Sequence, residues 1–279
     1  MLQEGIKIYF DFQEPLEHRI WLSGGTESVK GRSTADYPYS ELAIKPMKPW
    51  RAPSEKEIKM LVANDVPKNE DFSSNIAVTK IPEELIKQLQ ELGVSDLKSK
   101  ESVLSFYKTQ AYEKSFELID EFVCKYQFSA EKKAYYNYFV DQPDLDVVTL
   151  NYNKERVGLH IDNRDQLSVY DSQNGTSIFL LNLSSEDRYF LFVNQSASNI
   201  IDWIQDKKGE KLPGNYTVEY INKDFSDCFP EYNVVKLRIK PYEAYIAPAE
   251  NIIHDGSTEG SSLPGLKFMA GGYFWLLNN

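Results

Sequence analysis

The sequence predicts an α+β protein in which helices come first along the chain and a β-sandwich or β-barrel follows. Between residues 54 and 126, apolar side chains recur at the spacing of one helix face. From about residue 138 onwards, six to eight short runs rich in β-branched and aromatic residues alternate with turn residues. A hydrophobic fraction of 42% adds that a substantial core can be buried, which argues against a disordered chain.

The first half is expected to hold one strand, a loop-rich stretch and helices that support the later sheet. Residues 6–12 alternate in polarity as a strand does. Residues 24–53 contain three glycines and four prolines, and they either lie over the core or form a lid. A capping box of Ser54 and Glu57 marks the first helix. The expected helices cover residues 54–63, residues 82–93 and much of residues 101–126.

The second half is expected to consist mainly of strands joined by turns. Residues 184–187 predict a hairpin-like turn between the strands on either side. One short helix is expected at residues 198–206. Besides a strand that ends at residue 162, the expected strands cover residues 147–152, 177–183, 189–194, 216–220, 235–240, 243–248, 252–254, 266–270 and 273–276.

The composition narrows the classes of function and partner. With a net charge of −11, the chain lacks the basic face that nucleic acids and anionic membranes require. Its two cysteines, Cys124 and Cys228, form neither a disulfide framework nor a Cys-x-x-Cys zinc site, and they indicate a reducing compartment. Neither a secretory signal nor a membrane-spanning stretch is visible. We therefore expect a cytoplasmic protein that binds neither nucleic acid nor a membrane.

Two of the three histidines in the chain stand in patterns that suit metal binding. His160 and Asp162 are separated by one residue, so on a β-strand their side chains leave the same face. His254 is a distant candidate for a third ligand. Two imidazoles and one carboxylate occupy one face of an octahedral Fe(II) ion and leave the remaining positions open for a co-substrate and oxygen. The sequence therefore suggests a non-haem iron site made of His160, Asp162 and His254.

The metal site has a simpler alternative. A single His-x-Asp pair is a weak motif, because many such pairs occur by chance at turns and strand ends. His160 would then be a core histidine that bonds to Asp162, and His254 would belong to a loop before Asp255 and Gly256.

The residues around both histidines carry a resemblance to a known family. Residues 151–153, Asn-Tyr-Asn, lead through Gly158 to the first histidine. Residues 240–249 resemble the turn and strand that present a distal histidine, and His254 follows closely. Lys267 stands thirteen positions further on. In these features residues 145–279 resemble the Fe(II)- and 2-oxoglutarate-dependent dioxygenases.

The resemblance implies a fold and a domain organisation. Members of this family have a double-stranded β-helix core of the jelly-roll or cupin-like type. We therefore expect a single oxygenase domain, with residues 1–137 as an N-terminal loop and helical buttress and residues 138–279 as the jelly-roll core. The helices would pack on one side of this core.

The resemblance also implies the cofactors, Fe(II) and 2-oxoglutarate, and two residues for the second of them. In this family the far carboxylate of 2-oxoglutarate lies deep in the barrel beside a cation, since an unpaired buried charge is costly. Most members use arginine and some use lysine, so the role falls here to Lys267. A lysine is a point charge and not a bidentate fork, and Tyr152 is the candidate for an accompanying hydroxyl. The alternatives are an exposed strand lysine and one core tyrosine among 18.

The implied reaction is hydroxylation of an unactivated C–H bond of a small polar substrate, with succinate and carbon dioxide as co-products. An amino acid or an amino-acid-derived metabolite is the favoured substrate. Asp162 argues against halogenation, because halogenating members lack this carboxylate. Arg164, Asn163 and Trp275 are candidate substrate-binding residues, although Arg164 also fits a solvated loop.

Further alternatives remain from the sequence alone. Asp255 is a lesser pocket candidate. Asp141, Asp144 and Asp146 either meet a cationic substrate or form a solvated acidic turn. The protein could also be a related iron oxygenase that needs no 2-oxoglutarate or acts on a peptide, or a jelly-roll ligand-binding protein without catalysis.

Overall fold

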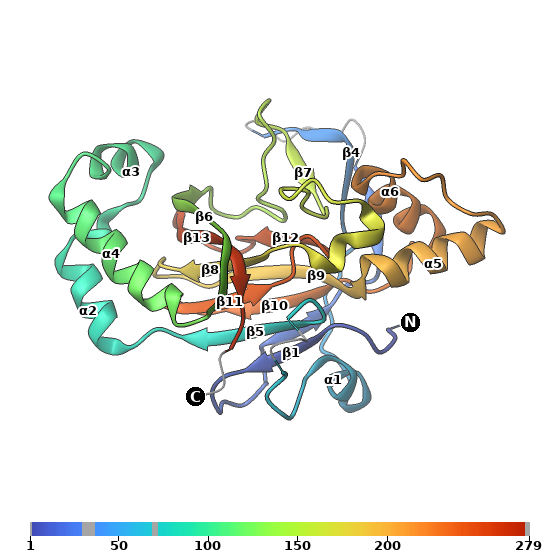
Figure 1. The fold of residues 1–279 in the computed structure, drawn as a ribbon, viewed down its shortest axis with the longest axis horizontal. Helices are drawn as coiled ribbons and strands as arrows, with labels where there is room; N and C mark the ends of the chain where they lie inside the picture. Colours follow the sequence, from blue (N-terminus) through green and yellow to red (C-terminus); the bar gives the residue numbers. More distant parts are fainter. Residues whose placement is uncertain (1, 30–36, 69–71, 277–279) are drawn as a thin grey trace.

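The computed structural model describes residues 2–29, 37–68 and 72–276. Within these ranges the protein is α+β, with three β-sheets and helices gathered at both ends of the sheets (Figure 1). Helices α2, α3 and α4 lie together at one end, and α5 and α6 lie at the other (Figure 1). The α+β class expected from the sequence is confirmed.

The largest sheet has six strands and combines early and late parts of the chain. β1 and β5 pair in parallel, and the other neighbours pair antiparallel. In spatial order its strands are β1 (Lys7–Phe10), β5 (Asn75–Lys80), β11 (Glu243–Ala247), β8 (Ser177–Asn182), β13 (Gly265–Phe274) and β6 (Gln127–Asp141).

A four-stranded antiparallel sheet lies against the first, and a small sheet lies beyond it. The four strands are, in order, β12 (Ile252–Ser257), β9 (Arg188–Ser196), β10 (Val235–Ile239) and β2 (Ile20–Leu22). The three strands of the small sheet are β3 (Thr26–Ser28), β4 (Tyr39–Pro46) and β7 (Arg156–Gly158).

From β8 to β13 the chain passes repeatedly between the two larger sheets. β8, β11 and β13 belong to the six-stranded sheet, whereas β9, β10 and β12 belong to the four-stranded sheet. The two sheets share one apolar cluster, to which β8 contributes Leu180, β11 contributes Tyr245, and β9 contributes Phe190 and Phe192. One of the sheets is a curled half-barrel. The hairpin expected at residues 184–187 is therefore wrong, because that turn carries the chain from one sheet to the other.

The helices begin where the sequence supplies capping side chains. Ser54 accepts a hydrogen bond from the Glu57 amide, and the Glu57 carboxylate accepts one from the Ser54 amide, so the expected capping box is confirmed. Gly93, with a φ of 79°, follows the end of α2. The helices are α1 (Glu55–Leu61), α2 (Glu83–Glu91), α3 (Lys100–Phe106), α4 (Gln110–Cys124), α5 (Ala197–Lys208) and α6 (Val218–Cys228).

Several expected elements have other boundaries or another type. The expected helical block after residue 100 is two helices, because Thr109 caps a second start. The strand expected at residues 216–220 is the start of α6, whose buried Val218, Ile221 and Phe225 follow the helical period beyond that window. The two strands expected at the C-terminal end are the single strand β13.

The six-stranded sheet has two different faces. Its outer face packs against α2, α3 and α4 through Leu266, Phe268 and Ala270 of β13. Its inner face looks towards the four-stranded sheet and carries Lys267 and Met269 of the same strand. Any functional group on the inner face therefore lies between the two sheets.

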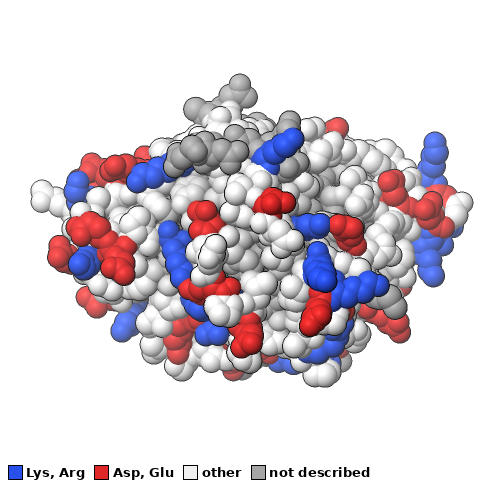
Figure 2. All heavy atoms as spheres, turned by 90° about the horizontal axis from the view of Figure 1, so that it is seen from below, with Lys and Arg blue, Asp and Glu red and all other residues white. Residues whose placement is uncertain are grey.

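The surface carries charges of both signs. On the face drawn in Figure 2, acidic and basic side chains are interspersed, and neither sign forms a continuous patch. Along the described ranges, no helix has the length and apolar character that crossing a membrane requires. The loop-rich stretch of residues 24–53 contains β3 and β4, and its residues 30–36 lie outside the described ranges. A lid in this stretch stays a prediction.

Candidate metal centre

His160 and His254 face each other across an antiparallel bridge. The His160 amide donates to the His254 carbonyl over 2.9 Å, and the His254 amide donates to the His160 carbonyl over 2.7 Å. Residues directly opposed in such a pair project their side chains from the same face. The two imidazole centroids are 4.9 Å apart as a result.

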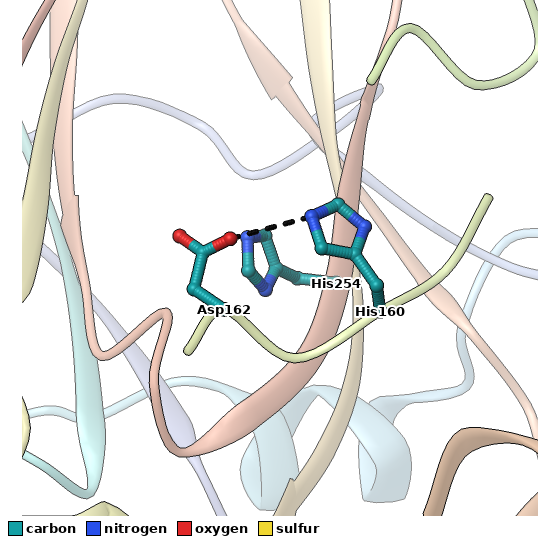
Figure 3. A group of neighbouring side chains, drawn as sticks. All are labelled: His160, Asp162 and His254. Carbon is teal, nitrogen blue, oxygen red and sulfur yellow. Dashed lines mark ion pairs between the residues drawn. The ribbon is translucent and has the colours of Figure 1, made fainter. Parts of the chain in front are cut away.

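Asp162 completes the group. Its amide donates to the Ala249 carbonyl over 3.0 Å, which fixes the backbone just after the bridge. Its Oδ1 lies 3.4 Å from Nε2 of His160, and one ligand atom from each of the three residues lies within 4.8 Å of the others. Figure 3 shows the carboxylate and both imidazoles turned towards one another. The three predicted ligands therefore meet, although Asp162 lies in a loop and not on a regular strand.

The local sequence explains how His160 reaches this place. β7 ends at Gly158, whose φ of 79° lies in the left-handed region. A Cβ at this position would lie 2.3 Å from the Ile44 carbonyl oxygen, so only glycine fits. Leu159 and Ile161 are buried in the apolar cluster beneath α5 and α6. Because successive side chains of this extended segment point to opposite sides, His160 points away from that cluster.

Both imidazoles are oriented by backbone carbonyls. Nδ1 of His160 lies 2.7 Å from the Gly158 carbonyl oxygen, and Nδ1 of His254 lies 3.1 Å from the Ile252 carbonyl oxygen. In the tautomer in which each Nδ1 donates, each Nε2 keeps a free lone pair. Metal-binding histidines are typically held in this way.

The charges of the three groups differ in the metal-free protein. Burial alone would lower the pKa of His160, but the hydrogen bond that its imidazole donates to Asp162 and the charge of Asp255 outweigh it and raise this pKa to about 9. Burial lowers the pKa of His254 to about 4. The pKa of Asp162 is lowered, because its histidine neighbours and Arg164 outweigh its burial. At neutral pH the group therefore holds one proton that a metal ion would displace.

Arg164 contacts the metal centre as a partner of Asp162. Its Nε lies 3.3 Å from Oδ2 of Asp162 and 3.0 Å from Oε1 of Glu250. Another guanidinium nitrogen donates to the Tyr136 hydroxyl over 3.0 Å. The expected substrate-binding role does not fit these contacts, because they use the guanidinium to hold a metal ligand in place.

Three other predicted site residues differ in burial. Asn163 is exposed. Trp275 is fully buried in the outer apolar cluster, where its Nε1 donates to the Pro67 carbonyl over 3.3 Å. The side chain of Tyr152 is 94% exposed, which does not fit a hydroxyl that accompanies a buried lysine. Trp275 and Tyr152 therefore do not fit their expected roles, whereas the role of Asn163 stays a prediction.

Lys267 is buried, as expected, and it belongs to an ionic cluster that the sequence did not reveal. Its Nζ lies 2.8 Å from the Asp141 carboxylate. Arg188, only 1% exposed, donates to the same carboxylate over 3.1 Å. Burial alone would raise the pKa of Asp141, but the two cations outweigh it and lower this pKa. Asp141 is therefore neither a solvated turn residue nor a free contact for a cationic substrate.

This cluster and the metal centre share one interior. Gly256 lies two residues after His254 on β12, hence on the same face and about 7 Å further along the strand. A Cβ at Gly256 would lie 3.1 Å from a terminal nitrogen of Arg188, so the absence of a side chain gives the guanidinium its place. Phe190, two residues after Arg188 on β9, has its ring centroid 5.6 Å from that of His254.

Tyr245 of β11 lies in the same interior. Its ring centroid is 4.4 Å from that of Phe190. Burial raises the pKa of Tyr245, so the hydroxyl keeps its proton and can donate it to a hydrogen bond. In the sequence, Arg188, Phe190 and Phe192 occur at the two-residue period of one strand face, which was the available signal for this group.

Asp255 has a supporting contact on the segment before β7. Its Oδ1 accepts hydrogen bonds from the Thr149 amide over 3.2 Å, the Thr149 hydroxyl over 2.7 Å and the Gly256 amide over 2.7 Å. Burial raises the pKa of Asp255 to about 6. These contacts fasten the segment around residue 149 to β12 beside His254.

Comparison with known proteins gives no family. No model of a protein family matches the chain, and no curated protein matches it. What the geometry establishes is a His-Asp-His group that could hold a metal, beside a buried cluster of two cations and one carboxylate.

Proposed function

We propose that the protein is an Fe(II)- and 2-oxoglutarate-dependent dioxygenase that hydroxylates an unactivated C–H bond of a small polar substrate. The observation that carries the proposal is the His160–His254 bridge, which brings two imidazoles and the Asp162 carboxylate together. The strand order also supports a jelly-roll core, because β6, β13, β8 and β11 lie opposite β12, β9 and β10 with repeated crossings between them.

The donor set fits the proposed metal. Two histidines and one carboxylate are the ligands of non-haem Fe(II) oxygenases, and the absence of a thiolate argues against an iron–sulfur cluster. The contacts that orient the group are present as well, since backbone carbonyls hold both Nδ1 atoms and Arg164 holds Asp162. When bound, Fe(II) would supply oxygen activation coupled to the decarboxylation of 2-oxoglutarate.

The buried cations fit the proposed co-substrate. Nε and one terminal nitrogen of Arg188 are buried without a hydrogen-bond partner among the described residues. Such orphaned donors are costly, and a bound carboxylate would satisfy them. Lys267 and the Tyr245 hydroxyl lie on the same interior. In the proposal, Arg188 and Lys267 bind the far carboxylate of 2-oxoglutarate, and Tyr245 takes the place expected for Tyr152.

The remaining expectations from the sequence become parts of the proposal. We take the chain as a single oxygenase domain of the cytoplasm that acts on a small molecule, with an amino acid or its derivative as the favoured substrate. Neither nucleic acid nor a membrane is a proposed partner. Arg164 serves the metal centre in this proposal, so the substrate contacts come from other residues.

Succinate release tests the proposal. Protein loaded with Fe(II) should convert 2-oxoglutarate to succinate slowly alone and faster with the right member of a panel of amino acids and small peptides. His254→Asn should abolish this release. His18→Asn is the matched control, because His18 is exposed and its φ of 58° suits asparagine.

A second measurement separates the proposal from its alternatives. Under anaerobic conditions, Fe(II) and 2-oxoglutarate together should give a weak visible charge-transfer band. Metal binding without this band and without succinate would favour a ligand-binding protein. Substrate oxidation without 2-oxoglutarate would favour another iron oxygenase.

A further inference from the structure

The ionic cluster between the sheets contains more cations than carboxylates. Lys267 and Arg188 both contact Asp141, and among the described residues no other carboxylate forms an ion pair with either of them. The side chains of Lys267 and Asp141 are 11% and 10% exposed, and that of Arg188 is 2% exposed. Buried charges are normally paired, so among the groups in direct contact this cluster has one positive charge without a carboxylate of its own.

A second buried pair in the same sheet system shows what a complete set looks like. Arg19 donates to both oxygens of Glu243 over 2.9 Å each, and both side chains are at most 2% exposed. One cation meets one carboxylate there, and both terminal nitrogens of Arg19 are bonded, so that only its Nε lacks a hydrogen-bond partner among the described residues. Arg188, in contrast, has only one bonded nitrogen. The excess of positive charge is therefore a property of the Asp141 cluster and not of buried arginines in this protein.

Asp255 is the other buried carboxylate nearby, and it forms no ion pair with Lys267 or Arg188. Its charge acts on Lys267, but its Oδ1 is already bonded by Thr149 and Gly256. Its other oxygen has no hydrogen-bond partner among the described residues, so it contacts neither cation directly.

We propose that Asp141 sets the charge of the co-substrate pocket, so that the pocket accepts one singly charged carboxylate and discriminates against a doubly charged group. This inference rests on the proposed function, because it takes 2-oxoglutarate as the ligand. With one monoanion bound, two cations face two carboxylates and the cluster is neutral. A dianion would leave one negative charge unmatched in a buried place.

Removing the charge of Asp141 should change both affinity and selectivity. In Asp141→Asn, two cations face the ligand without a competing carboxylate, and 2-oxoglutarate should bind about tenfold tighter, a size typical of coupling between neighbouring groups. An analogue in which a phosphonate replaces the far carboxylate should gain more than 2-oxoglutarate does, since its second charge then has a partner. The ratio of the two affinities is therefore the most direct readout.

Calorimetry on the full chain loaded with Mn(II), a redox-inert stand-in for Fe(II), measures both affinities. The titrants are 2-oxoglutarate and 2-oxo-4-phosphonobutanoate at pH 8, where the phosphonate is mostly dianionic. The wild type should prefer 2-oxoglutarate, and Asp141→Asn should shift the ratio towards the phosphonate. Glu243→Gln is the control, because it breaks a more deeply buried pair elsewhere and should lower the melting temperature without shifting the ratio.

A double mutant makes the test independent of folding defects in the single variant. Lys267→Met leaves one cation and one carboxylate, so 2-oxoglutarate should bind more weakly than in the wild type. Lys267→Met combined with Asp141→Asn restores a single excess positive charge, and the affinity should recover. A purely structural role for Asp141 predicts a further loss in the double mutant.

The outcomes separate this inference from the proposed function. If the wild type binds 2-oxoglutarate and releases succinate, but Asp141→Asn leaves the ratio unchanged and the double mutant shows no recovery, the inference is overturned while the function stands. If the Mn(II)-loaded wild type binds no 2-oxoglutarate at all, both fail.

Discussion

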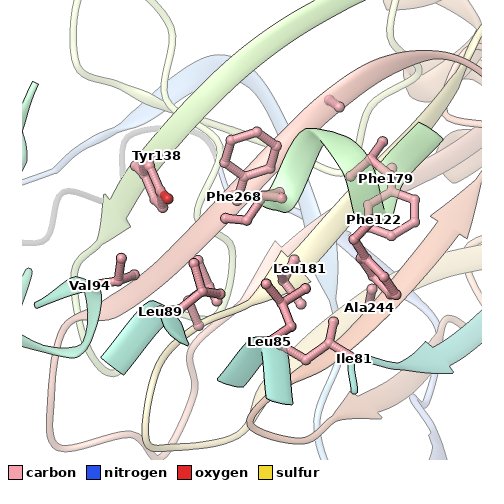
Figure 4. Packing of buried hydrophobic residues seen from close by; sticks show 14 of the residues in the cluster. Ile81, Leu85, Leu89, Val94, Phe122, Tyr138, Phe179, Leu181, Ala244 and Phe268 are labelled. Atoms are coloured by element: carbon pink, nitrogen blue, oxygen red, sulfur yellow. The ribbon is translucent and has the colours of Figure 1, made fainter. Parts of the chain in front are cut away.

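The two faces of β13 carry consecutive residues into opposite environments. On the outer face, Phe268 packs among apolar side chains of α2, α4 and neighbouring strands, a layer seen in Figure 4 with Leu85, Leu89 and Phe122. On the inner face, the side chain of Lys267 is only 11% exposed and lies in a cluster with two other charged groups. Outer and inner residues differ by one position in the sequence.

This difference between the two faces indicates that a functional site lies on the inner face. An apolar face needs no explanation beyond the stability that burial provides. A buried group of ions does need one, since replacing it by apolar side chains of similar volume is often neutral or even stabilising. The inner face therefore holds charges that stability alone does not account for, and it holds them beside the group of His160, Asp162 and His254.

The largest expected effect is the loss of metal binding on removal of an inner-face ligand. His254→Ala should lower the affinity for Fe(II) or Mn(II) by more than the about 10–100-fold that loss of an outer-shell partner causes. The free energy of unfolding of the metal-free protein should change much less. Metal titration and urea denaturation of the same sample check this. Unchanged metal affinity would contradict the proposed centre.

A substitution on the outer face should instead lower stability and leave metal binding unchanged. Phe268→Ala removes a fully buried aromatic ring and should lower the free energy of unfolding by about 3–5 kcal/mol. Metal affinity should stay within error, provided that the variant is measured below its transition. A large loss of metal affinity in the folded variant would show that the two faces are not independent.

The pH dependence of metal affinity follows from the inner-face charges. The pKa of His160 in the metal-free protein is raised to about 9, and a metal ion binds only the neutral imidazole. Affinity should therefore rise with pH and level off above about 9, with a gain of about hundredfold between pH 6 and 8. His254, with a pKa lowered to about 4, is already neutral there and adds no slope. Calorimetry at constant ionic strength measures it; a flat profile would refute the assigned charges.

The same group links pH to the stability of the metal-free protein, with the opposite sign. Because the folded pKa of His160 lies above its ordinary value of 6.5, its contribution to stability is fully present below pH 6.5 and is lost as pH rises through about 9. Metal binding should remove this dependence. Thermal melts at pH 6 and pH 9.5, with and without Mn(II), compare the two states.

Local signals were enough to predict much of the fold. The capping box at Ser54 and the strand predicted at residues 235–240 each depend on neighbours in the sequence. Both are confirmed, the strand as β10 (Val235–Ile239). The turn at residues 184–187 was predicted to join paired strands, because the sequence does not tell whether two successive strands share a sheet. The start of α6 was missed because residues 216–220 also alternate.

The site residues also divide into those predictable from the sequence and those that meet only in the folded protein. Spacing alone brought His160 and Asp162 together, and His254 was the third ligand because the chain has only three histidines, so the metal group was predictable. The cluster around Asp141 was not predictable. Arg188 and Asp141 are 47 residues apart, and they come together with Lys267 only once three strands are assembled. A charged residue in a strand pattern reads as solvent-exposed until its opposite neighbours are known.

The smallest expected effect is the loss of one hydroxyl group. It compares Tyr245 on the inner face with Tyr152 at the surface. Tyr245→Phe removes a hydroxyl from the inner face while keeping its ring against Phe190, and it should weaken 2-oxoglutarate binding by about fivefold, the value of one hydrogen bond of about 1 kcal/mol. Tyr152→Phe removes a hydroxyl from a side chain that is 94% exposed and should change neither affinity nor stability. Calorimetric titration of both Mn(II)-loaded variants measures the contrast. If Tyr152→Phe weakened binding and Tyr245→Phe did not, the co-substrate would lie outside the space between the sheets, and the burial of Lys267 would need another explanation.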